Sequence, residues 1–419
     1  MTHKTKSLAG TSEVESSYSY LSLFSGIGGL EHPSIPPVLF CEQDKDCHRV
    51  ISDRELTRST PIHGDIRTLA APPAASFVVG GWPCQDLSSA GNQVGLCGNR
   101  SSLFFDMLRV AKASGAHTLI GENVPNLLTI NGGKDFELVK QAVREHGFPY
   151  VSWRMLNARE FGLPQDRSRL FIVASKDPAY AQALHSQIPE LPSVGDTLDV
   201  HGFYWTGGKR SICFSTGYVP ALKVGGTDNK GRGTVAVFDG ITARKLTVGE
   251  NLALQGFSDI QLSDFVPSTL LRMAGNAVAK PVGQFVVASI MERRPPAGIK
   301  SGFALRSASG LIESGLEWSI DHKPTHKVSN LADFLDNKRH TPLSAQASAG
   351  LIVRSVRSGA VMPSELFDTL YKQTLDRGGK LHPSRGDSLA ALAVMHEDLL
   401  SYRNGLEDSD FYGEANDGE

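Results

Sequence analysis

The sequence has few cysteines, and their arrangement excludes one common kind of metal site. Five cysteines lie singly along 419 residues, and none forms a Cys-x-x-Cys pair with a His or Cys partner. Because structural zinc sites need such clusters of ligands, no metal is expected. Scattered free cysteines also fit a reducing, cytoplasmic setting. The five are Cys41, Cys47, Cys84, Cys97 and Cys213.

Long apolar runs and net charge are scarce as well. The chain contains no apolar stretch of the roughly 18 residues that a membrane helix needs. Residues 1–17 are polar, which predicts a flexible tail and not a signal peptide. The formal net charge is −2, so any contact with nucleic acid must come from a local basic surface. The clearest basic excess lies in 201–250, where the basic residues Lys209, Arg210, Lys223, Lys230, Arg232, Arg244 and Lys245 outnumber three acids.

Short apolar runs alternate with helical stretches between Tyr18 and Lys176. This alternation predicts an α/β fold with a mostly parallel sheet that is covered by helices on both faces. In such sheets ligands bind at the C-terminal ends of the strands, where the unusual residues of this chain lie. The apolar runs are at 21–24, 38–42, 77–81, 118–123 and 170–175, and the helical patterns at 103–112 and 136–145.

The rest of the chain divides by composition. After residue 176 the alternation gives way to Gly, Pro and aromatic residues without clear helices up to 235. Helical patterns return at 247–255 and after Asn276. Four predicted helices follow a linker, near 329–338, 344–357, 364–377 and 387–403. We therefore predict a flexible tail (1–17), a sheet domain (18–176, completed by 268–295), a loop-rich region (177–267), a linker (296–324), a helical domain (325–404) and a disordered acidic tail (405–419).

Cys84 follows a proline at the end of a predicted strand, in Gly81-Trp82-Pro83-Cys84-Gln85. Most free cysteines are buried core residues, and that interpretation stays open for this one. Two features favour a reactive thiol. The stretch 86–100 is polar and glycine-rich, as a mobile lid would be. Glu122 ends another strand, where its carboxylate is able to share the same pocket.

A glycine turn follows the first predicted strand, in Phe24-Ser25-Gly26-Ile27-Gly28-Gly29-Leu30. By itself such a turn is often only a connection. Glu42 comes 13 residues after Gly29, whereas a nicotinamide-binding fold places its acid roughly 20 residues on. Asp65 follows in Gly64-Asp65-Ile66. Glycines for close approach, a Glu for ribose hydroxyls and an Asp for an adenine amine suit a nucleoside without pyrophosphate, such as S-adenosylmethionine.

These segments occur in the order found in DNA cytosine-5 methyltransferases, and residues 20–290 resemble that family. FSGIGGLE (24–31), Glu42 and Gly64-Asp65-Ile66 are similar to its first three cofactor motifs, and GGWPCQDLS (80–88) to its catalytic motif. The other matching segments are RSSLF (100–104), ENV (122–124), LNAREFGLPQDRSRLFIV (156–173), RKLTVGENLALQGF (244–257) and GNAVAKPVG (275–283). The resemblance implies a Rossmann-like S-adenosylmethionine-dependent methyltransferase sheet, with a small loop-rich target-recognition domain and an appended C-terminal helical region.

The resemblance also implies roles for individual residues. Cys84 is implied to be the nucleophile that adds to C6 of cytosine, since C5 alone is a poor nucleophile. Glu122 is implied to hold the N3/N4 edge of the base, Arg169 to contact O2, and Arg167 to support the same pocket. A solvated strand-end acid and an ordinary surface arginine are the alternatives.

The implied cofactor pocket draws on residues from several motifs. Phe24 and Leu103 are explained equally well as core residues, and Asn276 as the N-cap of a helix. The residues implied to line the pocket are Phe24, Gly26, Gly28, Gly29, Glu42, Asp65, Ile66, Leu103, Asn276 and Val278.

The implied reaction is methyl transfer from S-adenosylmethionine to C5 of a flipped-out cytosine in duplex DNA, by a bacterial or phage modification or orphan enzyme. Residues 177–243 lie where the family keeps its target-recognition segment, and their basic excess fits phosphate contact. There Tyr204 and Trp205 are candidates to stack on bases, although Pro220-Ala221 departs from the family's Pro-Thr pair.

Two other functions share parts of this pattern. A tRNA cytosine-5 methyltransferase carries the same catalytic motifs, and an inactive DNA-binding relative keeps the fold without the chemistry. Intact Cys84, Glu122 and Arg169 argue against the inactive relative. We expect a cytoplasmic protein with a nucleoid-associated substrate, monomeric on DNA and without membrane contact. Residues 325–404 are a candidate for dimerisation or DNA contact.

Overall fold

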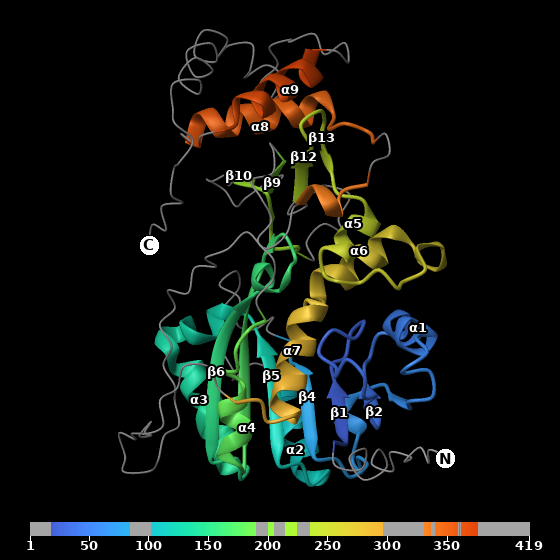
Figure 1. Ribbon diagram of the computed structural model, residues 1–419, viewed down its shortest axis with the longest axis vertical. Helices are drawn as coiled ribbons and strands as arrows, with labels where there is room; N and C mark the ends of the chain where they lie inside the picture. The colour runs from blue at the N-terminus through green and yellow to red at the C-terminus, as the bar shows by residue number, and fades with distance from the viewer. Residues whose placement is uncertain are drawn as a thin grey trace, which may run out of the picture.

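The largest element of the fold is a seven-stranded sheet with the order β3-β2-β1-β4-β5-β8-β6 (Figure 1). The computed structural model describes residues 18–83, 102–189, 200–204, 214–223, 235–295, 331–336, 340–358, 360 and 362–375. The first five strands of the sheet pair in parallel, whereas β8 runs antiparallel to both β5 and β6. The prediction of a mostly parallel α/β sheet is thus confirmed. The strands are β1 Tyr20–Leu23, β2 Leu39–Cys41, β3 Ile62–His63, β4 Phe77–Gly81, β5 Thr118–Asn123, β6 Tyr150–Asn157 and β8 Ser168–Ser175.

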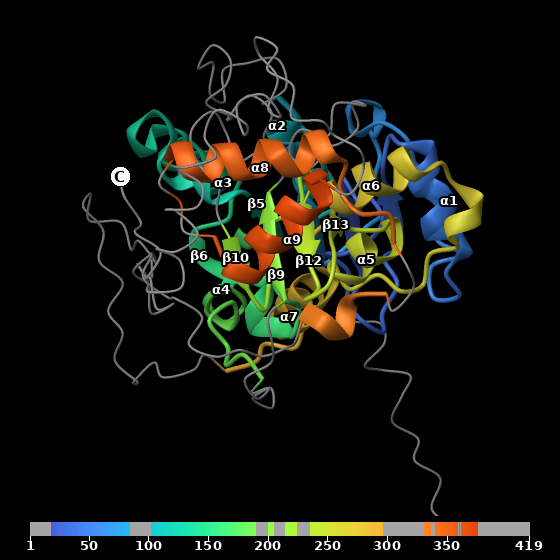
Figure 2. The ribbon, with the colours of Figure 1, turned by 90° about the horizontal axis from the view of Figure 1, so that it is seen from above.

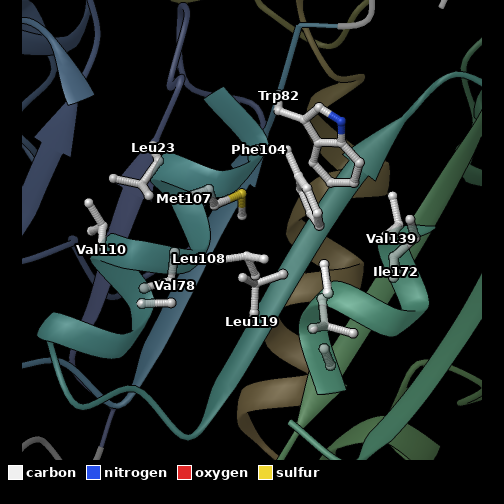
Figure 3. Close-up of a cluster of buried hydrophobic side chains, with 14 of the residues drawn as sticks. Leu23, Val78, Trp82, Phe104, Met107, Leu108, Val110, Leu119, Val139 and Ile172 are labelled. Carbon is white, nitrogen blue, oxygen red and sulfur yellow. The ribbon is translucent and has the colours of Figure 1, made fainter. Parts of the chain in front are cut away.

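The central strands are mostly apolar because helices cover both faces of the sheet. Successive side chains of a strand point to opposite faces, so Leu119 packs into one core and Ile120 into the other. The helices α2 (Ser102–Ala113) and α3 (Lys134–Glu145) cover the first face. Figure 3 shows this first core, where side chains of α2 and α3 meet those of β1, β4, β5 and β8. The second face is covered by α4 (Pro178–Ala183) and α7 (Lys280–Met291).

The connection between β1 and β2 departs from the usual strand–turn–helix pattern. Residues 24–38 form no helix, and three of them are prolines, which remove amide donors and fix the backbone against a helix. The first helix of the chain is α1 (Lys45–Asp53), which follows β2 and is capped by the side chain of Asp44. The glycine turn after β1 is therefore held by contacts with distant parts of the chain, described below.

A second, antiparallel sheet with the order β10-β9-β12-β13 lies beyond the C-terminal ends of the parallel strands (Figure 1). The helices α8 (Ala345–Ser358) and α9 (Ser364–Leu375) pack on it and share its core. Figure 2 shows both helices lying across this sheet. The strands are β9 His201–Tyr204, β10 Phe214–Thr216, β12 Val235–Phe238 and β13 Ala243–Lys245, and a short ladder joins β7 (Gln165–Asp166) to β11 (Val219–Pro220).

Several elements differ from the sequence prediction. The helices predicted at 344–357 and 364–377 are present as α8 and α9, whereas the one predicted near 387–403 lies outside the described residues. The stretch 177–235, predicted without helices, contains α4, which begins with the cap of Asp177 and has Pro178 at its first turn. Of the two α-helices directly before α7, α5 (Val248–Ala253) was predicted, but α6 (Pro267–Asn276) was not.

Candidate functional site

The glycine turn after β1 opens toward the C-terminal ends of the parallel strands. Phe24 has a φ of 54° and Gly26 a φ of 55°, left-handed values that favour glycine. A Cβ on Gly26 would have no atom within 4 Å, so the space above this residue is open. The amide of Gly26 donates to a carboxylate oxygen of Glu42 at 2.7 Å, which ties the turn to the end of β2.

The other two glycines of the turn are required by close packing with the protein itself. A Cβ on Gly28 would lie 2.8 Å from Nη1 of Arg54. A Cβ on Gly29 would overlap the carbonyl oxygen of Val278, and the backbone of Gly29 in turn crowds Gly283 of α7. The predicted ligand-binding glycines therefore divide: Gly26 faces open space, whereas Gly28 and Gly29 allow the turn to pack against later segments.

Two carboxylates stand at the ends of β2 and β3, as predicted. Glu42 accepts hydrogen bonds from the amides of Gly26 and Asp44, one on each oxygen, which leaves lone pairs free for hydroxyl donors. Asp65 is exposed at its edge and is paired with Arg67, whose Nη2 lies 2.7 Å from its carboxylate. Hydrogen bonding to Arg67 lowers the pKa of Asp65. A ligand that used Asp65 would have to replace Arg67.

Apolar side chains border the same space. Phe24 and Leu103 are partly buried against the core that contains Ile66, so both are core-edge residues. Asn276 is exposed at the last turn of α6. It is not an N-cap, since Ala279 occupies that position before α7, and the alternative interpretation of Asn276 was therefore wrong. Together with Gly26 and Glu42, these residues fit a nucleoside that places its ribose on a carboxylate and its ring on apolar surface.

A carboxylate–guanidinium pair joins the C-terminal end of β5 to the beginning of β8. Nε of Arg169 lies 3.0 Å from a carboxylate oxygen of Glu122, and the two side chains are 18% and 13% exposed. Gly81 pairs with Glu122 in the sheet, and a Cβ on Gly81 would lie 2.8 Å from the other carboxylate oxygen. Glycine at 81 thus makes room for the carboxylate beside the segment that leads into Cys84.

The environment of Glu122 raises the pKa of its carboxyl. Burial raises the pKa of this carboxyl, and the positive charges of Arg169 and Arg167 offset only part of the rise. Within the part of the chain that the structure describes, the partner of Glu122 is Arg169, with which it forms an ion pair. A buried carboxyl with few donors is poised to exchange a proton or a hydrogen bond with a ligand.

Arg167 is buried near this pair, and its terminal nitrogens are hydrogen-bonded to backbone carbonyls. It is 2% exposed, and its terminal nitrogens donate to the carbonyls of Leu222, Gly275 and Ala277 at 2.7–3.0 Å. The structure therefore brings Arg167 next to Glu122 and Arg169 but gives it a positioning role between segments. Sequence reasoning, which placed it in the catalytic set, did not identify these carbonyl partners.

Gln165 makes a similar set of buried hydrogen bonds, and it was not among the predicted site residues. Its Nε2 donates to the carbonyl of Leu254, and its Oε1 accepts from the amide of Leu222. Gln255 continues the network to the carbonyl of Ala274. These bonds, together with those of Arg167, join the chain just before β8 to the segment after β11 and to the C-terminal ends of α5 and α6.

Cys84 and residues 85–101 lie outside the described residues. The chain leading to Cys84 is fixed by Trp82, which is 4% exposed and packs on Phe104 with ring centroids 4.9 Å apart (Figure 3). Cys41 and Cys47 are buried. Burial raises the pKa of Cys41 to about 12 and raises that of Cys47 as well, so both are poor nucleophiles.

Three residues singled out in the predicted recognition region, Tyr204, Lys223 and Arg244, make contacts within the protein. The hydroxyl of Tyr204 donates to the carbonyl of Ala221, and Nζ of Lys223 lies 4.2 Å from the centroid of its ring. Arg244 is buried and makes a bidentate pair with Glu250 at 2.8–2.9 Å. Trp205, Lys209, Arg210, Lys230 and Arg232 lie outside the described residues.

The described residues contain neither a membrane-spanning helix nor a cluster of metal-binding side chains. None of the helices there is both long and apolar enough to span a bilayer. No group of three or more His, Cys, Asp or Glu side chains is placed there to hold a metal ion.

Comparison with known proteins gives one family and several relatives. The family described as C-5 cytosine-specific DNA methylase matches residues 18–201. Type II methyltransferase M2.BsuMI of Bacillus subtilis (strain 168) is 31% identical over 392 residues, which cover 85% of this chain and 98% of that protein. Type II methyltransferase M.HaeII of Haemophilus aegyptius is 28% identical over 311 residues, 65% of this chain and 93% of that one. The solved structure of S. pombe Dnmt2 methyltransferase aligns with a TM-score of 0.45 at 14% identity, over 66% of this chain and 99% of that one.

Proposed function

This chain belongs to the family of C-5 cytosine-specific DNA methylases, and we propose that it methylates C5 of a flipped-out cytosine in duplex DNA through a covalent adduct with Cys84. It is a methyltransferase of the bacterial type II kind, and S-adenosylmethionine is its methyl donor. The family acts on DNA by its description, which favours DNA over tRNA as the substrate. The observation that carries the mechanism is the Glu122–Arg169 pair at the ends of β5 and β8, beside the segment that leads into Cys84.

The nucleophilic step needs a thiolate, and the described cysteines do not supply one. Cys41 and Cys47 are buried with raised pKa values, whereas Cys84 follows Pro83 directly after β4. Addition of the Cys84 sulfur to C6 forms a C–S bond and moves the C5–C6 electron pair to C5. C5 would then take the methyl group as the bond between that group and the donor sulfur breaks, with S-adenosylhomocysteine as the leaving group. Loss of the C5 proton to solvent would re-form the C5–C6 double bond as the bond between C6 and the Cys84 sulfur breaks.

Glu122 accounts for the charge that attack on C6 creates. Since burial raises its pKa, the carboxyl is able to carry a proton and donate it in a hydrogen bond to N3 of the base. Negative charge that spreads to N3 during attack is then stabilised by this donor. Arg169 fixes the orientation of Glu122 and presents its remaining donors to O2 of the same ring.

Residues at the glycine turn fit the cofactor of the family. Bound S-adenosylmethionine supplies an electrophilic methyl group on a sulfonium. Glu42 would accept the ribose hydroxyls, since each of its oxygens already accepts one amide and retains lone pairs. Phe24, Ile66 and Leu103 would contact the adenine ring, and Asp65 its amine after release of Arg67.

The two sheet regions are given different roles in the proposed reaction. We assign 18–176 with 268–295 to catalysis and cofactor binding and 177–267 to target recognition, as the sequence predicts. The apolar faces of α8 and α9 are buried against the second sheet, which supports a role of these helices inside one chain. A monomer on DNA therefore fits better than a dimer built on α8 and α9.

Trapping with a modified base tests the covalent step. With duplex DNA that contains 5-fluorocytosine, the C5 position has no proton to lose, so the wild-type adduct should persist in denaturing gels in the presence of S-adenosylmethionine. Cys84→Ser should form no adduct, and Cys97→Ser should behave like the wild type. An adduct on Cys84→Ser would overturn the assignment of the nucleophile. Labelled methyl groups found only in tRNA would overturn the choice of DNA.

A further inference from the structure

The glycine turn between Phe24 and Leu30 lacks the helix that normally fixes such a turn. Residues 24–38 form no helix, so the amides and carbonyls of the turn are not held by a following helical ladder. The turn nevertheless holds Phe24 in a left-handed conformation that is rare for a residue with a Cβ. The amides of residues 24–26 are bonded to Cys41 and Glu42, and the carbonyl of Ile27 is held by a different segment.

Arg54 is the C-cap residue of α1, and its side chain reaches the carbonyl of Ile27 in the turn. Its Nη1 donates to the carbonyl of Ile27, and its Nε donates to a carboxylate oxygen of Asp259 at 2.8 Å. The guanidinium carbon lies 5.4 Å from the centroid of the Phe257 ring. The side chain is 17% exposed. Arg54 therefore joins the turn to a segment 205 residues further along the chain.

Asp259 extends this connection to α7. Nζ of Lys280, the first residue of α7, lies 3.2 Å from the carboxylate oxygen that also accepts from Arg54. The sequence around the turn carries the mark of the same contact, because Gly28 has no Cβ where Nη1 of Arg54 lies. Any side chain at 28 would displace the guanidinium.

We propose that Arg54 is a positioning residue for S-adenosylmethionine binding, which holds the glycine turn in its binding conformation through Ile27 and anchors it to Asp259. Arg54 acts through the turn and does not touch the cofactor. The inference rests on the proposed function in one respect, that the turn binds the cofactor. Neither the Glu122–Arg169 pair nor the second sheet is part of this connection. Loss of Arg54 should therefore lower the affinity for the cofactor and leave the affinity for DNA unchanged.

The test measures binding directly, with S-adenosylhomocysteine as a stable probe in isothermal titration calorimetry on the full chain. Arg54→Gln should raise the Kd about tenfold, the equivalent of one charge-assisted hydrogen bond. Asp259→Asn, which keeps the bond to Ile27, should raise it by less, about threefold. In steady-state assays the KM for S-adenosylmethionine should rise in parallel, with kcat at saturating cofactor within about twofold of the wild-type value.

Arg49→Gln is the matched control, since Arg49 also belongs to α1 and also contacts a later segment, at the carbonyl of Asp264 and the ring of Phe265, but makes no described contact with the glycine turn. Its Kd and the DNA affinity of all variants should equal those of the wild type. A folded Arg54→Gln with unchanged Kd, or with a loss of kcat alone, would overturn the inference. If Arg54→Gln does not fold, an unchanged Kd in Asp259→Asn would overturn it instead. A wild-type chain that binds no S-adenosylhomocysteine would refute the proposed function, and the inference with it.

Discussion

Two buried carboxylate–arginine pairs, one in each sheet region, use the same residue types for opposite purposes. In the seven-stranded sheet, Glu122 has one described partner, Arg169, and Nε of this arginine lies 3.0 Å from the carboxylate in an ion pair. In the second sheet region, Glu250 receives both terminal nitrogens of Arg244 and two backbone amides, at 2.6–2.9 Å. Burial raises the pKa of Glu122. Burial acts in the same direction on Glu250, but its donors lower the pKa below the usual value.

The difference indicates that the number of donors, and not burial, separates a structural carboxylate from a reactive one. Glu250 is 4% exposed, and its four hydrogen bonds join β13, the capping box of α5 with Thr247, and Asp336 near the C-terminal helices. All of its acceptor sites are used. Glu122 keeps acceptor capacity at the end of a strand where a ligand is expected. The same substitution at both positions should therefore have different consequences.

The largest expected effect is on catalysis in Glu122→Gln. The amide cannot deliver a proton to N3 of the base, so kcat should fall by about a hundredfold to ten-thousandfold. The midpoint of urea unfolding should stay the same or rise, because a buried carboxyl with one donor is replaced by a neutral group of the same shape. Methyl transfer from labelled S-adenosylmethionine and urea titration measure the two quantities. A large loss of stability with retained turnover would reverse the comparison.

Glu250→Gln should show the opposite behaviour. Removing the charge leaves Arg244 buried without its counterion, and breaking such a pair destabilises a fold by about 3–5 kcal/mol. The free energy of unfolding should fall by that amount, with transfer activity largely kept at low temperature. Denaturant titration and activity of the same preparation are the measurements. Wild-type stability in this variant would mean that the four hydrogen bonds contribute little.

The dependence of stability on pH should distinguish the two pairs without any assay of function. Glu250 has a lowered pKa in the folded chain, so its contribution is present above the unfolded value of 4.5 and is lost as the pH falls through the folded value. Glu122 has a raised pKa, so its contribution is present below 4.5 and is lost as the pH rises through the folded value.

Urea unfolding as a function of pH measures both slopes. Glu250→Gln should flatten the loss of stability in acid, and Glu122→Gln should flatten the loss of stability as the pH rises above the unfolded value of 4.5. Each variant is the control for the other. Identical slopes in the two variants would show that the environments of the two carboxylates are alike.

The sequence predicted the parallel sheet well because its central strands are buried on both faces and read as continuous apolar runs. Strand β6 escaped prediction, since half-buried Trp153 and Arg154 interrupt its apolar pattern. The strands of the second sheet are three or four residues long and are covered by helices over a hundred residues later in the chain. No local pattern reveals such pairing.

The site was predictable to the extent that it rests on motifs in order. Glu122 and Arg169 were expected together and lie 3.0 Å apart. The positioning role of Arg167 and the contact of Arg54 with Asp259 were not expected, because their partners lie 55 to 205 residues away in the chain. Only the folded chain brings these groups into contact.

A third pair, Asp65 with Arg67, extends the comparison to the surface and has the smallest expected effect. The two side chains are 30% and 60% exposed, and exposed pairs contribute little to stability. Arg67→Gln should leave the melting temperature unchanged. Because Asp65 would no longer have to exchange a partner, the affinity for S-adenosylhomocysteine should increase about twofold.

Calorimetry on Arg67→Gln and Asp65→Asn checks this ordering. Asp65→Asn should weaken binding, since the amide offers one acceptor where the carboxylate offers two. Weaker binding in Arg67→Gln would instead mean that Arg67 itself contacts the ligand. In that case the exposed pair would act as a unit, and a carboxylate in this fold would not need to be free of its arginine in order to bind.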